Sequence, residues 1–292
     1  MKISELTDER VDSIIEIALA EDIGRGDITS EALIPCSLEG KAFMLVKEAG
    51  VLAGSKIAEK TLHKVDPKLK VEILIQDGSK VKPGDIAMLV AGNVRSILKA
   101  ERVALNFIQR LSGIATATAQ YVEKVRDLGV EIADTRKTTP GLRLLEKYAV
   151  HMGGGRNHRL DLAEAVLIKD NHIDSLRILG MTFKEIVTKA RENTPPDIKI
   201  EVEARTVEEA AQAADLGVDI IMLDNMNIDE MTKAVELISG RAEIEASGGI
   251  TLKNVRAAAQ TGVDFISVGA LTHSFKSLDI SLELKTQTLK LI

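Results

Sequence analysis

The 292-residue sequence contains no tryptophan, and aromatic residues make up 2% of the chain. With 45% hydrophobic residues a sizeable core is expected, and it must be packed from aliphatic and methionine side chains. Proteins that bind single-stranded nucleic acid stack the bases on aromatic side chains, so this scarcity argues against that class.

Cysteine is represented by Cys36 alone. One cysteine excludes a disulfide framework within the chain and a zinc site built from thiolates. No apolar run approaches the roughly 18 residues of a membrane span, and the acidic, polar first ten residues are unlike a signal peptide. We therefore expect a reducing, cytoplasmic location.

The five histidines match no zinc motif in their spacing. A metal site based on histidine is therefore not expected, and His63 and His151 are interpreted as structural or surface residues.

The first 128 residues predict a small α+β domain and a long connecting helix. Residues 8–20 carry an apolar helical stripe, and residues 40–91 consist of short β-type runs with one helix among them. Residues 94–128 form a long helical pattern, in which small residues around Gly113 indicate close helix packing or a bend.

From residue 130 onward, short apolar runs alternate regularly with helical patterns. This alternation predicts a parallel sheet whose strands are buried on both faces. We count about six strands, fewer than the eight of a complete (βα)₈ barrel. The sequence therefore predicts an α/β fold with an open or incomplete barrel, and a doubly wound sheet remains the alternative.

Polar residues and glycines follow the predicted strands, at the barrel end where catalytic groups gather. Cations follow the early strands, carboxylates the middle ones and glycines the last two. In chain order these residues are Thr135, Arg136, Lys137, Lys169, Glu203, Asp224, Ser247, Gly248, Gly249, Gly269 and Ala270.

Residues 134–172 concentrate cations and a Gly-Gly-Gly run inside a chain whose net charge is −6. Such a block predicts a site for a multiply charged anion. Arginine offers a planar fork and lysine a compact charge, so the set would suit a pyrophosphate or a dicarboxylate. The set consists of Arg136, Lys137, His158, Arg159 and Lys169.

A solvated basic face is the alternative interpretation of the same block. It fits Arg143 and Lys147, which lie on a helical pattern, and it fits Lys169 poorly, because Lys169 directly follows an apolar run.

The carboxylates of Glu203 and Asp224 could hold Mg²⁺ together with substrate phosphates, bond sugar hydroxyls, or pair with the nearby cations. The glycines after the last two strands would let backbone N–H groups approach a phosphate. Ordinary strand-to-helix turns are the alternative for these glycines.

Several long strings occur in one order and are similar to a known family: EDIGRGDIT, ERVALNFIQRLSGIAT, TRKTTPGLRLLEKYAV, GGGRNHR, LIKDNHI, EVEA, LDN, SGGI and VGALTHS. Together they resemble the quinolinate phosphoribosyltransferase family over nearly the whole chain. The resemblance implies an N-terminal α/β sandwich domain (residues 1–110, with a C-terminal helix, 275–292, packed back on it). It also implies a C-terminal open α/β barrel (residues 111–274) and a homodimer.

The family's reaction converts quinolinate and phosphoribosyl pyrophosphate (PRPP) to nicotinate mononucleotide, pyrophosphate and CO₂ with Mg²⁺, in NAD synthesis. By resemblance, Arg136, Lys137, His158, Arg159 and Lys169 contact quinolinate and pyrophosphate, and Arg102 comes from the partner subunit. Glu203 and Asp224 serve the ribose and Mg²⁺-PRPP. The 5′-phosphate is implied to lie among Ser247, Gly248, Gly249, Gly269 and Ala270, with His273 alongside, and Thr135 is a further expected substrate-binding residue.

Three rival functions remain open from the sequence. A relative associated with molybdenum transport could transfer phosphoribosyl to another acceptor. A Schiff-base aldolase could use Lys169, and a non-catalytic protein could bind anions at the same place. The full cationic set with Arg102 favours a dicarboxylate substrate.

Overall fold

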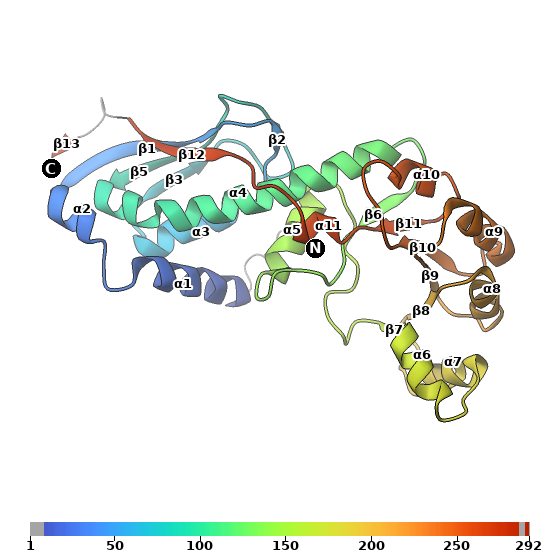
Figure 1. Ribbon diagram of the computed structural model, residues 1–292. Coiled ribbons are helices and arrows are strands. Elements are labelled where there is room, and N and C mark those ends of the chain that lie inside the picture. Colours follow the sequence, from blue (N-terminus) through green and yellow to red (C-terminus); the bar gives the residue numbers. More distant parts are fainter. Residues whose placement is uncertain (1–8, 286–289, 292) are drawn as a thin grey trace. The chain divides into compact units, whose positions relative to one another are not determined.

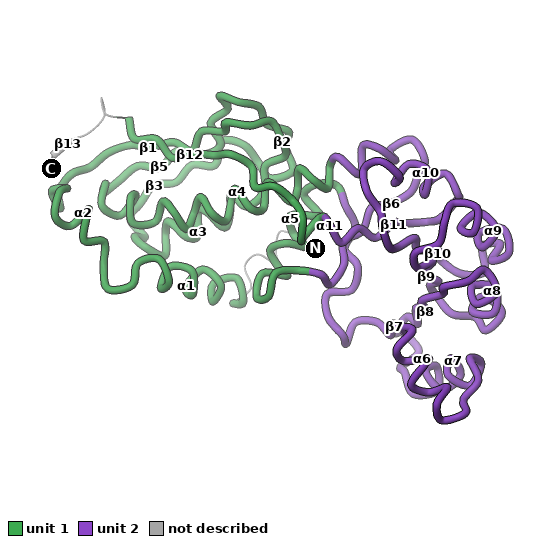
Figure 2. Tube along the Cα trace, viewed as in Figure 1, with its two compact units in different colours: residues 1–119, 138–154, 271–292 green, residues 120–137, 155–270 purple. Residues whose placement is uncertain are grey.

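The computed structural model describes residues 9–285 and 290–291, and the chain divides into two compact units (Figures 1 and 2). Unit 1 comprises residues 1–119, 138–154 and 271–292, and unit 2 comprises residues 120–137 and 155–270. Among the described residues, no helix is long and apolar enough to cross a membrane.

Unit 1 contains an antiparallel sheet with the strand order β12-β1-β5-β3, in which β13 also pairs with β1. Helices α3 and α4 lie against this sheet, and α1 packs beside α3 (Figure 1). The strands are β1 (Leu38–Val46), β2 (Gly50–Val51), β3 (Lys70–Ile73), β4 (Lys80–Val81), β5 (Ile86–Asn93), β12 (Ile280–Leu284) and β13 (Lys290–Leu291). The helices are α1 (Glu9–Ile23), α2 (Ile28–Leu33), α3 (Ser55–Val65), α4 (Val94–Val125), α5 (Arg143–Met152) and α11 (Ala270–His273).

The aliphatic core expected from the composition fills the space between this sheet and its helices. Met44 and Met88 come from paired strands, and Leu62 and Ile108 come from α3 and α4; all four are fully buried. Methionine is a flexible side chain that suits the irregular spaces of such a core.

The predicted C-terminal helix over residues 275–292 is wrong where the structure describes it, because residues 280–284 form strand β12. This strand pairs antiparallel with β1, from Ala42↔Leu284 to Val46↔Ile280. Ile280, Leu282 and Leu284 alternate along β12 and pack on the core, so a period of two fits the segment better than a helical one. Residues 286–289 and 292 lie outside the described residues.

The long helix predicted over residues 94–128 is confirmed as α4, which runs without interruption from Val94 to Val125. A Cβ atom at Gly113 would lie 2.3 Å from the carbonyl oxygen of Lys276. The small residue thus serves close packing of the chain against α4. The units divide the chain differently from the predicted domains, since their boundary falls within α4 and α5 belongs to unit 1.

Unit 2 contains a six-stranded parallel sheet with the order β6-β11-β10-β9-β8-β7. The first strand lies beside the last, as in a barrel, whereas a doubly wound sheet has its first strand inside; the doubly wound alternative is therefore excluded. The strands are β6 (Glu131–Ala133), β7 (Val166–Ile168), β8 (Ile200–Ala204), β9 (Ile220–Asp224), β10 (Glu243–Ser247) and β11 (Phe265–Ser267).

The barrel is open between β6 and β7, and the chain at Arg156 adds an isolated parallel bridge to the free edge of β6. The Arg156 N–H donates to Ile132 O at 2.7 Å, and the Asp134 N–H donates to Arg156 O at 3.2 Å. The predicted open barrel is confirmed, with the glycine-rich segment beside its first strand. The helices of unit 2 are α6 (Asp170–Arg177), α7 (Phe183–Glu192), α8 (Val207–Asp215), α9 (Ile228–Ile238) and α10 (Val255–Ala259).

Candidate active site

A cavity of about 330 Å³ lies at the carboxyl ends of the strands of unit 2. Most of its lining residues were predicted from the sequence as strand-end or loop residues: Thr135, Arg136, Lys137, His158, Arg159, Lys169, Glu203, Asp224 and Ser247. Leu167, Met222, Glu245 and Ser267 complete the lining and were not predicted. The structure thus gathers the cations and the carboxylates into one site.

The barrel strands place side chains two residues apart on the same face. Glu201 and Glu203 follow this rule on β8, and Glu245 and Ser247 follow it on β10. The later member of each pair is at the strand end, where the sequence predicts site residues, and the earlier one is deeper. Glu245 can therefore be found by stepping back two positions from the predicted Ser247, and Glu201 stands in the same relation to Glu203.

The cationic side of the cavity is formed by guanidinium groups and a lysine. Burial lowers the pKa of Arg159, and the nearby charge of Arg136 lowers it further. Arg159 Nη1 also donates to Ala165 O at 2.8 Å, which fixes the side chain. Bringing two like charges together costs free energy that a bound anion would offset, so the arrangement suits a carboxylate or a phosphate.

The acidic side of the cavity is formed by Glu203 and Asp224. Burial raises the pKa of Glu203, and the charge of Asp224 raises it further, while Lys169 opposes both. Lys169 Nζ lies 3.6 Å from Glu203 Oε2. A carboxylate whose pKa is raised by a second carboxylate beside it is a suitable environment for a hydrated divalent cation or for sugar hydroxyl groups.

The loop that carries His158 is held by a buried carboxylate. Asp134 is 0% exposed and accepts hydrogen bonds from the His158 N–H at 2.9 Å and from Asn157 Nδ2 at 2.7 Å. The Asp134 carboxylate thus links the end of β6 to the loop, and it positions His158 at the cavity.

Beneath the cavity, His158 meets two buried carboxylates. Its Nε2 lies 3.2 Å from Glu201 Oε2 and 3.1 Å from Glu245 Oε2, and the two glutamates are 1% and 0% exposed. The Arg159 N–H donates to His158 Nδ1 at 2.8 Å. Within the described residues this is the group whose ligand atoms are close enough to hold a metal ion.

The predicted phosphate loop follows β10, which pairs with β11. Gly248 has a φ of 91°, and a Cβ atom there would lie 2.3 Å from Asn225 Oδ1, so the position requires glycine. Ser247 lines the cavity, while Gly269 and Ala270 follow the neighbouring strand. Because α10 starts at Val255 and is short, anion binding here would depend on local backbone N–H groups more than on a helix dipole.

Two predicted site residues belong to unit 1. Arg102 is exposed on α4, and His273 lies in α11 with its Nδ1 2.6 Å from Ser274 Oγ. The prediction that Lys147 is a solvated charge on a helix face is wrong, because this side chain is 1% exposed. Arg143 donates to Thr138 Oγ1 at 3.0 Å in the same unit.

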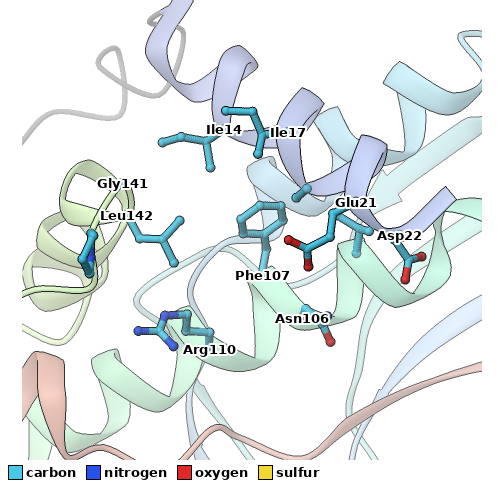
Figure 3. Close-up of a pocket in the computed structure, with 12 residues that line it drawn as sticks. Ile14, Ile17, Glu21, Asp22, Asn106, Phe107, Arg110, Gly141 and Leu142 are labelled. Atoms are coloured by element: carbon cyan, nitrogen blue, oxygen red, sulfur yellow. The ribbon is translucent and has the colours of Figure 1, made fainter. Parts of the chain in front are cut away.

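Unit 1 has a cavity of its own, of about 390 Å³, between α1, α4 and the turn at residues 140–142 (Figure 3). Its walls are largely apolar, with Ile14, Ile17 and Phe107 among them. Arg110, which also lines it, forms an ion pair with the buried Glu146. With its main cation paired, this cavity lacks the convergent charges of the one in unit 2.

Two family models together match residues 27–112 and 114–283. They describe the N-terminal and C-terminal domains of quinolinate phosphoribosyl transferase. The chain belongs to the quinolinate phosphoribosyltransferase family. The predicted resemblance is thereby confirmed over both domains.

Individual relatives agree with this assignment. The chain is 45% identical over 290 residues to "Quinolinate phosphoribosyltransferase [decarboxylating] 2b, mitochondrial" of Nicotiana tabacum, covering 94% of this chain and 82% of the relative. It is 45% identical over 277 residues to a probable nicotinate-nucleotide pyrophosphorylase [carboxylating] of Synechocystis sp., covering 94% and 92%. The crystal structure of NadC from Streptococcus pyogenes superposes with a TM-score of 0.92 at 40% identity, covering 98% of this chain and 99% of that one.

Proposed function

We propose that this protein transfers the phosphoribosyl group of PRPP to quinolinate with loss of CO₂, and so forms nicotinate mononucleotide and pyrophosphate for NAD synthesis. It is a pentosyltransferase. The observation that carries the proposal is the match to both domains of the family, at 45% identity to a decarboxylating quinolinate phosphoribosyltransferase. The unit 2 cavity agrees with it, since quinolinate is a dicarboxylate and the cavity gathers several cations.

Quinolinate binds through the cationic wall of the cavity. Arg136 and Arg159 hold its carboxylates by paired N–H donors, and Lys137 and Lys169 add point charges. His158, whose backbone N–H donates to Asp134, lines the cavity beside these cations. Rigid support of this kind places the pyridine nitrogen for attack on the sugar.

PRPP lies toward the later strands. Glu203 and Asp224 face the ribose hydroxyls, and the turn around Ser247 and Gly248 receives the 5′-phosphate. Gly249, Gly269 and Ala270, with His273 alongside, complete the predicted phosphate-binding set, and Thr135 is a further predicted substrate contact. This orientation puts the anomeric carbon between the carboxylates and the cations.

Mg²⁺ is held mainly through the PRPP phosphates, with Glu203 and Asp224 as the protein carboxylates nearest to it. The support for this is the raised pKa of Glu203 beside Asp224, which a nearby cation would relieve. When bound, the ion neutralises charge on the departing pyrophosphate. The protein's own contribution is to orient both substrates and to stabilise charge.

The reaction proceeds by departure of pyrophosphate from a sugar with oxocarbenium character, attack by the pyridine nitrogen, and decarboxylation at the adjacent ring carbon. No covalent nucleophile is needed, so positioning and electrostatic stabilisation dominate. Lys169 stabilises negative charge during decarboxylation from its place beside Glu203.

The enzyme acts in the cytoplasm as a homodimer in which Arg102 of one subunit completes the site of the other. Arg102 is exposed on α4, next to the apolar cavity lined by Val103 and Phe107 of the same helix. An exposed guanidinium beside an apolar hollow is a typical composition for a subunit interface.

The decisive experiment incubates purified protein with Mg²⁺, PRPP and quinolinate labelled at the leaving carboxylate. Release of labelled CO₂ and formation of nicotinate mononucleotide are expected, with much slower turnover of nicotinate or nicotinamide. Absence of turnover with quinolinate in folded protein would falsify the proposal. Borohydride trapping of Lys169 by a carbonyl substrate would support the aldolase instead, and PRPP binding without pyrophosphate release would support a non-catalytic anion-binding protein.

A further inference from the structure

The cluster of His158, Glu201 and Glu245 has an unusual balance of donors and acceptors. One N–H group, at His158 Nε2, faces two carboxylates at 3.2 Å and 3.1 Å. Glu201 Oε1 and Glu245 Oε1 are buried and have no hydrogen-bond partner among the described residues. An ionised carboxylate oxygen without a donor is costly in a buried site, so the cluster favours an additional proton.

The backbone determines where that proton resides. The carboxylates raise the pKa of His158 against the opposing effect of burial. The Arg159 N–H nevertheless donates to His158 Nδ1 at 2.8 Å, and a nitrogen that accepts a hydrogen bond carries no proton. The imidazole is thus neutral with its proton on Nε2, and the additional proton is on a carboxyl group.

Glu245 is the carboxyl group best placed to hold it. Burial raises its pKa well above the usual glutamate range and the charge of Glu201 raises it further, while His158 and the nearby Ser267 hydroxyl lower it. Glu245 lines the substrate cavity, whereas Glu201 does not. A protonated Glu245 adds no negative charge to a cavity that receives a dicarboxylate.

The same tautomer argues against a metal ion in the cluster. A neutral imidazole that binds a metal through Nε2 must carry its proton on Nδ1. Here Nδ1 is the acceptor of the Arg159 N–H. The hydrogen bonds of the cluster therefore fit an additional proton on a carboxyl group, and not a bound metal ion.

We propose that Glu245 is the catalytic acid that protonates the ring carbon from which CO₂ departs. This inference rests on the proposed function. As the bond between the ring carbon and the leaving carboxylate breaks, its electron pair remains on the carbon and takes the proton from the Glu245 carboxyl. The products of the step are CO₂, a new C–H bond and the Glu245 carboxylate, so one proton is consumed in each turnover.

After each turnover Glu245 regains a proton from solvent. His158 lines both the substrate cavity and a second cavity of about 230 Å³. As a neutral imidazole whose Nδ1 accepts the Arg159 N–H, it orients the carboxylates and does not relay the proton.

The test separates the two chemical steps in single turnovers of Glu245→Gln. Pyrophosphate release is expected to stay within a few-fold of the wild-type rate. Release of CO₂ should slow by about 100-fold or more, as for the loss of a general acid, and the phosphoribosylated dicarboxylate should accumulate. Equal slowing of both products, or no slowing of CO₂ release, would overturn the assignment. A wild-type protein that releases no pyrophosphate would instead refute the proposed function.

Glu243→Gln is the matched control, because Glu243 is on the same strand, pairs with Arg156 and Lys199, and does not line the substrate cavity. It should leave the ratio of the rates of pyrophosphate release and CO₂ release unchanged.

Infrared spectroscopy tests the protonation of Glu245 in the wild-type protein, so its result does not depend on whether a variant folds. The carbonyl band of a protonated carboxyl should be present at pH 6 and decline only at higher pH, well above the range of exposed glutamates. A spectrum without that band at pH 6 would also overturn the proposal.

Discussion

Lys169 Nζ lies 3.6 Å from Glu203 Oε2, so the ends of the neighbouring strands β7 and β8 are joined by an ion pair inside the cavity. The partners differ in exposure: the Lys169 side chain is 47% exposed and that of Glu203 is 9% exposed. Lys169 is therefore able to turn toward a substrate anion, whereas Glu203 stays in place. Loss of the lysine would leave Glu203 with Asp224 as its main charged neighbour.

Replacement of Lys169 by methionine should shift the acidic limb of the pH profile. Burial and Asp224 raise the pKa of Glu203, and Lys169 lowers it, so Lys169→Met raises it further. If the ionised Glu203 carboxylate is required, activity is lost as pH falls through this pKa, and the acidic limb of kcat/KM moves to higher pH. We also expect kcat to fall by about 10²-fold, as for loss of an electrostatic contact to developing charge.

The control is Lys184→Met, which removes an exposed charge on α7. Its acidic limb should coincide with that of the wild type. An unshifted acidic limb in Lys169→Met would mean that the charge of Lys169 does not affect the pKa of Glu203 in solution.

Replacement of Asp134 by asparagine should loosen the loop that carries His158. The buried carboxylate accepts from the His158 N–H and from Asn157 Nδ2, and an amide group can supply one acceptor oxygen. A cost of about 1–3 kcal/mol in the free energy of unfolding is expected, with a raised KM for quinolinate. Urea unfolding and steady-state kinetics measure the two effects.

The control is Asp161→Asn, at an exposed position of the same segment, which should change neither the free energy of unfolding nor the KM for quinolinate. A normal KM in Asp134→Asn would show that other contacts hold the loop.

Much of this site could be predicted because its residues follow apolar strands directly. Arg136, Lys169 and Asp224 were found in this way, since strand ends in a parallel barrel converge on one cavity. Glu245 was not predicted although the alternation of strand residues marks it, because it lies two residues before the end of its strand.

Other features depend on contacts between distant segments and have no local signal. His158 reaches Asp134, 24 residues earlier in the chain, because Arg156 adds to the edge of β6. The helix predicted over residues 141–150 is confirmed as α5. Lys147 is nevertheless buried, because consecutive residues of α5, from 144 to 150, are all covered and not only those on one face. Strand β12 likewise exists because β1 offers it an edge. Tertiary context overrides local pattern in both cases.

Replacement of Gly248 by alanine should impair PRPP binding. The added methyl would lie 2.3 Å from Asn225 Oδ1, and the φ of 91° is unfavourable for alanine as well. The turn must shift, so we expect a KM for PRPP raised by about tenfold or more while the KM for quinolinate changes less. Gly249→Ala is the comparison: its φ of 63° is also positive, but no atom lies within 4 Å of the new methyl. Equal effects of the two variants would mean that backbone strain, and not the contact with Asn225, controls the turn.

A shared active site predicts recovery of activity when two inactive variants are mixed. Arg102→Ala and Lys169→Ala should each be nearly inactive as homodimers. In their heterodimer, one site combines the intact Lys169 of one subunit with the intact Arg102 of the other, while the second site lacks both. Random exchange of subunits makes half of the dimers heterodimers, so activity should return to about a quarter of the wild-type value.

The control for this experiment mixes Arg136→Ala with Lys169→Ala. Both residues line the same cavity of unit 2, so each site of the heterodimer lacks one of them and no activity should return. Subunit exchange is verified by mass spectrometry of differently tagged chains. If exchange is complete and the first mixture stays inactive, Arg102 acts within its own subunit; if Arg102→Ala is active by itself, the residue has no part in the site. Recovery in the first mixture and none in the second is the outcome that a site shared between subunits requires.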